Sequence, residues 1–341
     1  MSNRLNEDPR IDPRIKAVLG HIPCAPAFQA SSREEIIAAF SAIPPGENPL
    51  DVAINSLDFA TIAPEAGLEI KTIAIPSSPD GNSINLLVIT PEGPGPWPCV
   101  YYIHGGGMAM MSCYDQNYRA WGRMIAHQGV VVVMVDFRNA LLPSSVPEVA
   151  PYPAGLNDCV SGLRWLRANT DALNVDASRI ILAGESGGAN LALATLLKTK
   201  QDGDLAGIKG LYLMCPYLRG EWAAEPGSSA LENSGIIMEL RGSNWGSMGY
   251  GIEAYRAKDM LAWPGFATEA DLAGLPPVVI NVNECDPLRD DGVELYRKLL
   301  RAGVPARCRQ LVGTTHGTEI FLVCPDVSAD VARDMTALAQ A

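Results

Sequence analysis

The sequence predicts an α/β protein in which a mostly parallel, mixed sheet is covered by helices on both faces. Two observations lead to this prediction. From about residue 66 to the C-terminus, short apolar runs alternate with helical segments, which is typical of domains built around a parallel sheet. The first two runs instead alternate apolar and polar residues and flank the turn sequence "SSPDGNS", which indicates an antiparallel pair of strands.

The chain begins with a segment, residues 1–50, that we expect to be helical and separate from the sheet. The stretch "SSREEIIAAF" contains a helix start, because a serine is followed three residues later by a glutamate. Two such capping boxes are available, Ser31 with Glu34 and Ser32 with Glu35. The proline-proline-glycine sequence at 44–46 is predicted to end this helix.

The other elements follow from apolar periodicity and from the turn residues between them. Strands are predicted at 68–75, 84–90, 98–106, 130–137, 180–183, 208–218, 276–285 and 305–313. Helices are predicted near 116–128, at 155–169, directly after residue 186, at 291–303 and at the C-terminus.

One interval does not fit this alternation. Residues 219–274, which are rich in Gly, Trp and Met, separate two predicted strands. Long insertions at the strand ends of such sheets usually form lids or binding elements. We therefore expect a catalytic domain at 51–218 and 275–341, and a helical cap built from the insertion with the N-terminal segment packed beside it.

Composition excludes several classes of function. The 341 residues are 48% hydrophobic and 19% charged, and the formal net charge is −12. Such an acidic protein is not expected to bind nucleic acid or an anionic membrane. The charged N-terminus lacks the apolar core of a signal peptide, and the longest apolar run is too short to span a bilayer. We expect a cytoplasmic protein with no stable membrane association.

Cysteine and histidine usage argues against a metal site. None of the eight cysteines forms a C-x-x-C pair, and the four histidines are scattered along the chain. A zinc site needs clustered ligands. We expect reduced, mostly buried thiols, no metal and no other cofactor.

The stretch "IILAGESGGANLALA" contains the candidate nucleophile. Residues 184–188 fit G-x-S-x-G between a strand and a helix, a turn so tight that the serine hydroxyl projects clear of the sheet. The next backbone N–H, that of Gly187, points toward an oxyanion forming at Ser186. A dinucleotide-binding turn is excluded because Ser186 occupies the position of the second glycine of G-x-G-x-x-G.

A serine hydroxyl needs a base, and the base needs a carboxylate to orient it. His316 is the only histidine after Ser186, and it follows the last predicted strand. The carboxylate should lie between the two in sequence. Asp286 is the first acid on the loop after a strand and is our choice. Three neighbours compete with it: Asp290, the runner-up, Glu284 and Asp291.

The stretch "YYIHGGGMA" is the candidate source of oxyanion donors. Three glycines, 105–107, end a predicted strand and allow the backbone to approach a substrate closely. A phosphate loop would need G-K-[ST], which is absent. We expect His104 to anchor this loop rather than to transfer protons.

From about residue 66 onward, the chain resembles the alpha/beta-hydrolase fold and, within it, the hormone-sensitive-lipase-like family of bacterial carboxylesterases. The resemblance is carried by six motifs in the family's order: "HGGG" at 104, "VDFRNA" at 135, "PYPAGLNDCVSGLRWL" at 151, "GESGGANLA" at 184, "DPLRDDG" at 286 and "HG" at 316.

The resemblance implies a catalytic triad of Ser186, Asp286 and His316. It also implies an oxyanion hole formed by the N–H groups of Gly106, Gly107 and Gly187, with Gly105 as a further candidate donor. Glu185 fills an acidic position usual before the nucleophile, where it orders the site rather than reacts. A cap made from N-terminal helices and an insertion is also implied.

The chain departs from the family in three places. Gly187 stands where family members often have alanine, and Met108 stands where an aromatic residue often follows HGGG. The loop at 139–153 is longer than usual.

These observations together predict a serine carboxylesterase that hydrolyses short- to medium-chain esters through an acyl-enzyme. An amidase or a lipase using the same triad is an alternative, and a non-catalytic small-molecule receptor is a second alternative from a different class. The partner is a small ester, and a homodimer is compatible with the sequence.

Overall fold

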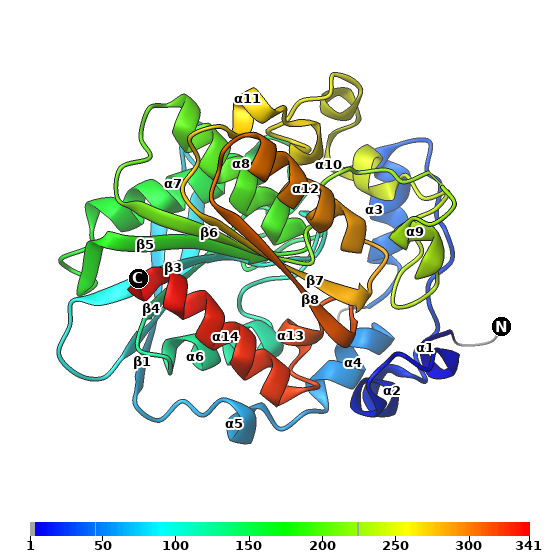
Figure 1. The fold of residues 1–341 in the computed structure, drawn as a ribbon, viewed down its shortest axis with the longest axis horizontal. Helices are drawn as coiled ribbons and strands as arrows, with labels where there is room; N and C mark the ends of the chain where they lie inside the picture. The colour runs from blue at the N-terminus through cyan, green and yellow to red at the C-terminus, as the bar shows by residue number, and fades with distance from the viewer. Residues whose placement is uncertain (1–3, 45, 224) are drawn as a thin grey trace.

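The computed structural model describes residues 4–44, 46–223 and 225–341, and a single eight-stranded sheet runs through its centre (Figure 1). The strand order is β1-β2-β4-β3-β5-β6-β7-β8. The β1–β2 and β2–β4 pairs are antiparallel, and every other neighbouring pair is parallel. The predicted mostly parallel, mixed sheet is thereby confirmed. Residue 45, within the predicted helix stop, lies outside the described residues.

Each strand overlaps one of the runs from which strands were predicted. Their bounds are β1 Leu68–Pro76, β2 Ser83–Pro91, β3 Trp97–Ile103, β4 Val131–Asp136, β5 Val175–Glu185, β6 Ile208–Met214, β7 Val278–Cys285 and β8 Ala306–Thr315. All six residues of β4 are buried, as expected for a strand covered on both faces.

Helices cover both faces of the sheet (Figure 1). One face carries α7 (Ala154–Ala168), α8 (Gly187–Gln201) and α12 (Arg289–Arg301), and the other carries α6 (Gln116–Ala126), α13 (Thr318–Phe321) and α14 (Pro325–Gln340). Successive strand residues point to opposite faces. In β3, Tyr101 accordingly packs in one apolar core and Tyr102 in the other.

In the described residues before β1 there are five helices: α1 Arg4–Glu7, α2 Pro13–Leu19, α3 Arg33–Ser41, α4 Pro49–Asn55 and α5 Phe59–Ile62. The predicted start of α3 uses the second of the two possible offsets. Ser32 is the N-cap, and its side chain accepts a hydrogen bond from the Glu35 amide at 3.3 Å. The Glu35 carboxylate reaches the amide and hydroxyl of Ser31. Ser32 therefore caps the helix, and Ser31 is tied to the first turn through Glu35.

The insertion between β6 and β7 forms α9 (Ser229–Glu232), α10 (Trp245–Arg256), a 3-10 helix (Pro264–Phe266) and α11 (Glu269–Leu272). The N-terminal segment lies beside it. The Phe40 ring on α3 meets Trp245 on α10 edge-on, with 5.6 Å between ring centroids. The side chain of Asn244 exchanges two hydrogen bonds with the backbone of Ala30.

The carboxyl ends of parallel strands lie at one edge of a sheet, which is where α/β proteins bind ligands. The loops after β3, β5, β7 and β8 all begin at this edge. They carry the HGGG sequence, Ser186, Asp286 and His316. The topology thus brings four segments together that are far apart in the sequence.

Candidate active site

Ser186 occupies the turn between β5 and α8 in a backbone conformation that side chains rarely adopt, with φ 54° and ψ −120°. Such strain costs of order 1–3 kcal/mol and is found mainly at functional sites. The adjacent backbone leaves no space for side chains, because a Cβ at Gly184 would lie 2.9 Å from the Ile103 carbonyl oxygen. A Cβ at Gly188 would collide with the carbonyls of Ile103 and His104. The glycines therefore permit the turn, and the turn presents the half-buried serine.

The serine, histidine and aspartate expected from the sequence form one hydrogen-bonded line. His316 Nε2 lies 3.0 Å from Ser186 Oγ, and His316 Nδ1 lies 2.9 Å from Asp286 Oδ2. The second carboxylate oxygen of Asp286 accepts the amide N–H of Leu288 at 2.8 Å. Asp286 is fully buried and His316 is 6% exposed, so water competes little for these bonds.

The environment of His316 favours its protonated form. Burial lowers its pKa, but the charge and the hydrogen bond of Asp286, together with the charges of Glu319 and Glu185, outweigh burial and raise the pKa above its ordinary value. An imidazolium that forms during a reaction would be stabilised by the same contacts.

The three competing carboxylates are engaged elsewhere. Asp290 accepts from the Ser229 amide at 2.6 Å, and Glu284 accepts from the Gly313 amide at 2.8 Å. Asp291 accepts from the Leu218 amide and from the Trp222 indole, each at 3.0 Å. Among these four acids, the structure brings Asp286 to His316.

The HGGG loop lies against the start of α8. A Cβ at Gly187 would lie 2.7 Å from the Gly107 nitrogen and Cα, so the two backbones are in direct contact. Within the described chain, the amides of Gly106, Gly107 and Gly187 have no protein acceptor. Gly106 and Gly107 have φ values of 84° and 65°, which glycine adopts without strain. Three unused donors therefore lie near Ser186 at the positive end of α8.

Gly105 differs from these glycines. Its amide donates to Glu185 Oε1 at 2.5 Å and lies 3.1 Å from the Tyr118 hydroxyl. Because this donor is occupied, Gly105 serves the loop and is unavailable to a substrate. Of the candidate donors, it is the one that the structure turns inward.

Glu185 binds the HGGG loop through the Gly105 amide. Its buried carboxylate accepts hydrogen bonds from the hydroxyls of Tyr102 and Tyr118 as well as from Gly105. Burial raises its pKa to about 7, although these three donors act in the opposite direction. The two tyrosines have no marker in the sequence that distinguishes them from core residues, apart from the proximity of Tyr102 to HGGG.

His104, the first residue of the HGGG sequence, is fully buried. Its ring stacks on Phe137 with 4.3 Å between centroids, and Nδ1 lies 3.1 Å from the Gly105 carbonyl oxygen. Nε2 lies 3.6 Å from Asp136. Burial lowers the pKa of His104. These contacts agree with an anchoring role, which stays a prediction.

One cluster in the described chain has metal-ligand character. The ligand atoms of Cys215, Asp286 and His316 lie within 4.8 Å of one another. Two of these residues are already hydrogen-bonded to each other, and burial raises the pKa of Cys215 well above the thiol's ordinary value. A cysteine binds a metal as the thiolate, and this buried environment disfavours the thiolate form of Cys215.

A tryptophan that the sequence did not single out lies over the HGGG loop. A Cβ on Gly107 would lie 2.7 Å from the outer ring carbon of Trp245. This indole belongs to the insertion, and its ring is half-buried. Tryptophan enrichment in the insertion was the available signal, but no spacing linked residue 245 to Gly107.

Comparisons with known proteins agree with this geometry. Residues 100–320 match a family described as alpha/beta hydrolase fold. The carboxylesterase NlhH of Mycobacterium tuberculosis is 31% identical over 249 residues, which cover 72% of this chain and 74% of that protein.

Solved structures extend the similarity to nearly the whole chain. The esterase Est22 is 54% identical, has a TM-score of 0.93, and covers 98% of this chain and 99% of its own. A brefeldin A esterase described as a bacterial homologue of human hormone-sensitive lipase is 35% identical, has a TM-score of 0.88, and covers 98% and 94% of the two chains. The protein therefore belongs to the alpha/beta-hydrolase family, in the branch of bacterial carboxylesterases related to hormone-sensitive lipase.

Proposed function

We propose that this carboxylic-ester hydrolase acts on small esters of short- to medium-chain acids, with Ser186 as nucleophile, His316 as general base and Asp286 as its orienting acid. The observation that carries the proposal is the unbroken line of hydrogen bonds from Asp286 through His316 to Ser186, at 2.9 and 3.0 Å. A hydroxyl is a weak nucleophile until such a base takes its proton.

The reaction proceeds in two halves. His316 takes the Ser186 proton as the oxygen attacks the ester carbonyl, and the imidazolium then gives this proton to the departing alcohol. Water, deprotonated by His316, attacks the acyl-enzyme, and the proton returns to Ser186 as the acid leaves. Asp286 stays ionised and holds the imidazole in the tautomer that accepts at Nε2.

The amides of Gly106, Gly107 and Gly187 bind the oxyanion in both tetrahedral intermediates. Two observations support this role: these amides have no protein acceptor in the described chain, and the backbones of Gly107 and Gly187 are in contact next to Ser186. Donors that are already oriented need no rearrangement when charge develops, which is why such groups contribute strongly to rate.

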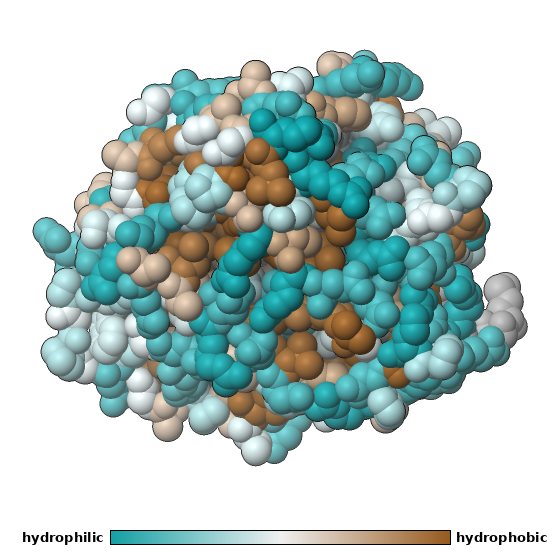
Figure 2. Space-filling view, in the orientation of Figure 1, coloured by the Kyte–Doolittle hydropathy of each residue, from teal (hydrophilic) through white to brown (hydrophobic). Residues whose placement is uncertain are grey.

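The substrate class is favoured by the surroundings of the site. The half-buried Trp245 indole lies against Gly107 of the HGGG loop, and the half-buried Phe40 ring packs edge-on against that indole. Ser186 itself is half-buried. On the face in Figure 2, polar side chains separate the apolar areas. The large apolar side chains that are exposed in the described chain are dispersed in sequence: Ile43, Val52, Leu300 and Val312. Because these few side chains come from four separate segments, they favour small dissolved esters over a lipid interface.

We also propose that residues 1–50 and 219–274 form a cap over the catalytic domain at 51–218 and 275–341. Contacts between α3 and α10, and between Trp245 and Gly107, support this cap.

None of the helices in the described ranges combines the length and apolarity needed to cross a membrane. A cytoplasmic location and a homodimer stay predictions.

The test is a series of p-nitrophenyl esters of increasing acyl length, assayed with the intact enzyme and with Ser186→Ala. We expect turnover to be fastest for the shorter chains and to disappear in the variant. A matched anilide distinguishes an amidase, because the proposed enzyme cleaves it much more slowly than the ester. Ligand binding without turnover in the intact enzyme would contradict the proposal and favour a receptor.

A further inference from the structure

The loop that carries Asp286 is held by side chains from α9 in the insertion. The Nδ2 group of Asn233, the residue after α9, donates to the carbonyl oxygens of Glu284 at 3.1 Å and of Asp286 at 3.0 Å. The hydroxyl of Ser229, the first residue of α9, donates to the Pro287 carbonyl oxygen at 2.8 Å. Three backbone carbonyls around the proposed triad acid are therefore held by two side chains.

The amide of Asn233 can take only one orientation here. It is fully buried, and its Oδ1 accepts from Arg10 Nη2 at 2.9 Å. An amide presents donors on one side and an acceptor on the other. Reversal would turn donors toward the guanidinium and an acceptor toward two carbonyl oxygens, so the NH₂ group must face the Asp286 loop.

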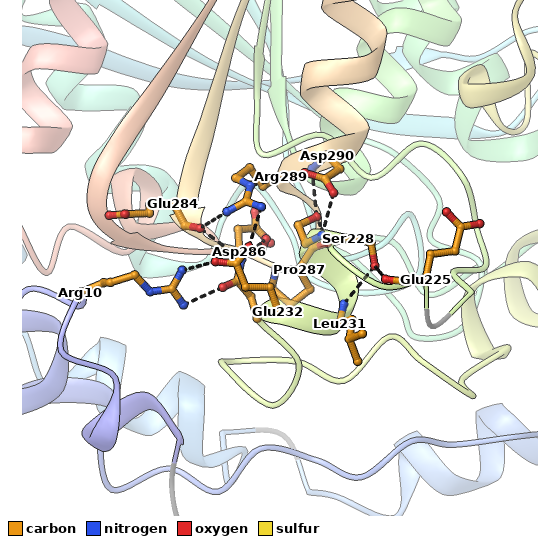
Figure 3. Close-up of polar contacts among 12 residues, drawn as sticks. Arg10, Glu225, Ser228, Leu231, Glu232, Glu284, Asp286, Pro287, Arg289 and Asp290 are labelled. Atoms are coloured by element: carbon orange, nitrogen blue, oxygen red, sulfur yellow. Dashed lines mark hydrogen bonds and ion pairs between the residues drawn. The ribbon is translucent and has the colours of Figure 1, made fainter.

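Arg10 extends this connection to the N-terminal segment. Figure 3 shows its side chain reaching from that segment toward Glu232, to which it is bonded at 2.7 Å. Asp8 holds the other edge of the guanidinium, at 2.6 Å. Arg289, at the start of α12, bonds to the second oxygen of Glu232 at 2.8 Å (Figure 3).

An aspartate carboxylate lies only two rotatable bonds from its backbone, so the loop sets where it meets His316. We propose that Asn233 is a positioning residue for Asp286, which places the alignment of the catalytic line under the control of α9 and, through Arg10, of the N-terminal segment. This inference rests on the proposed function, because it assumes that Asp286 is the acid of the triad.

The His316 environment provides a readout for this role. Asp286, Glu319 and Glu185 are the charged groups that favour its protonated form, and burial opposes them. Loosening the Asp286 loop weakens the bond between Asp286 and His316. The pKa of His316 then falls, and the acidic limb of the kcat/KM profile moves to lower pH. Loss of folded protein alone would lower the whole profile without moving this limb.

The experiment compares Asn233→Leu with the intact enzyme on p-nitrophenyl acetate across pH. Leucine has similar volume and adds no charge. We expect kcat to fall roughly 10- to 100-fold, the penalty typical of a misplaced catalytic group. We expect KM to change little and the acidic limb to shift to lower pH. Active-site titration with an organophosphate corrects for unfolded enzyme.

A neighbouring pair of serines provides a matched test if Asn233→Leu does not fold. Ser229→Ala removes the bond to Pro287 and the bond that the hydroxyl accepts from the Asp290 amide. Ser228→Ala instead removes the α9 cap formed with Leu231 and touches no part of the Asp286 loop. We expect Ser229→Ala to lower kcat and shift the limb in the same direction as Asn233→Leu. We expect Ser228→Ala to change only thermal stability.

Ser186→Ala and Asp286→Asn separate the two proposals. If Ser186→Ala retains activity, the proposed function is wrong. If Ser186→Ala is inactive but Asp286→Asn keeps the intact enzyme's kcat, the esterase stands, whereas Asp286 is not the triad acid and the positioning role of Asn233 falls with it. If both are inactive while Asn233→Leu and Ser229→Ala keep the intact enzyme's kcat and pH profile, the triad stands and the positioning role of Asn233 is refuted. A fall in kcat with an unmoved limb also refutes it.

Discussion

The two sides of this active site are held by different parts of the molecule. The HGGG loop is held from within the core, where Glu185, Tyr102 and Tyr118 are each at most 1% exposed. The Asp286 loop is held by the insertion and the N-terminal segment, through Asn233 and Arg10, and the Arg10 side chain is 26% exposed. Substitutions on the core side should therefore lower stability and kcat together. Substitutions on the outer side should lower kcat with little change in stability.

The largest expected effect comes from the outer side, at the acid itself. Asp286→Asn should lower kcat by on the order of 10⁴, because the amide favours the wrong tautomer of the histidine. Asp290→Asn is the matched control. Its carboxylate caps Ser229 rather than His316, and asparagine can still accept that bond. Steady-state kinetics of both variants decide the choice between the two acids, and an inactive Asp290→Asn beside an active Asp286→Asn would reverse it.

The next effect tests how closely the core side is packed. Gly187→Ala places a methyl group 2.7 Å from the nitrogen and Cα of Gly107. The HGGG loop must then move, and its donors leave the oxyanion position. We expect kcat to fall by up to about 10²-fold, approaching the loss of a whole donor.

The measurement for Gly187→Ala is kcat together with the melting temperature. An unchanged kcat would show that the loop accommodates the methyl group. The close approach of Gly187 and Gly107 would then be unimportant for rate.

On the core side, Glu185 should make the free energy of unfolding depend on pH. Its pKa is about 7 in the folded protein, so the folded state keeps a proton that the unfolded chain releases near pH 4.5. The contribution of this retained proton to the free energy of unfolding is complete below pH 4.5, and it is lost as the pH rises through 7. The shift corresponds to roughly 3 kcal/mol of unfolding free energy.

Glu185→Gln should remove this part of the pH dependence. Urea unfolding of the variant and the intact enzyme between about pH 4.5 and 8 measures the difference. The variant should also lose activity, because an amide cannot accept from Gly105, Tyr102 and Tyr118 together. Parallel stability curves would show that Glu185 is ionised throughout this range.

The two sides also differ in how far the sequence predicts them. Gly184, Ser186 and the HGGG glycines lie within short motifs whose backbone requirements are visible locally. His316 follows from chain order. The confirmed sheet follows from apolar periodicity. Asn233 has no such signal, because its partners are backbone carbonyls more than 50 residues away, and carbonyls are the same in every sequence.

The choice among four nearby acids shows the same limit. Glu284 lies near the end of β7, Asp286 lies on the loop that follows, and Asp290 and Asp291 lie in the first turn of α12. Chain order admits all four of them. Only the paths of β7 and α12 determine which carboxylate faces His316. Likewise, Trp245 reaches Gly107 because α10 folds back over the sheet edge, a long-range contact that periodicity does not encode.

The smallest expected effect lies at the outermost link. Arg10→Ala removes the partner of the Asn233 Oδ1 but leaves both bonds from Asn233 to the loop. Partly exposed ion pairs contribute at most about 1 kcal/mol, so kcat should fall no more than about fivefold. Arg4→Ala is matched to it, since Arg4 docks the same segment on the carbonyls of Glu232 and Ser234 without touching Asn233.

We expect Arg4→Ala to leave kcat unchanged and Arg10→Ala to lower it, with both lowering the melting temperature slightly. Equal kcat values would mean that the N-terminal segment stabilises the fold without reaching the catalytic line. A loss of kcat in Arg10→Ala as large as that in Asn233→Leu would contradict the expectation that Asn233 matters more than Arg10. The guanidinium, rather than the two carbonyl contacts, would then hold the asparagine in place, and the outer side would be as tightly coupled to catalysis as the core.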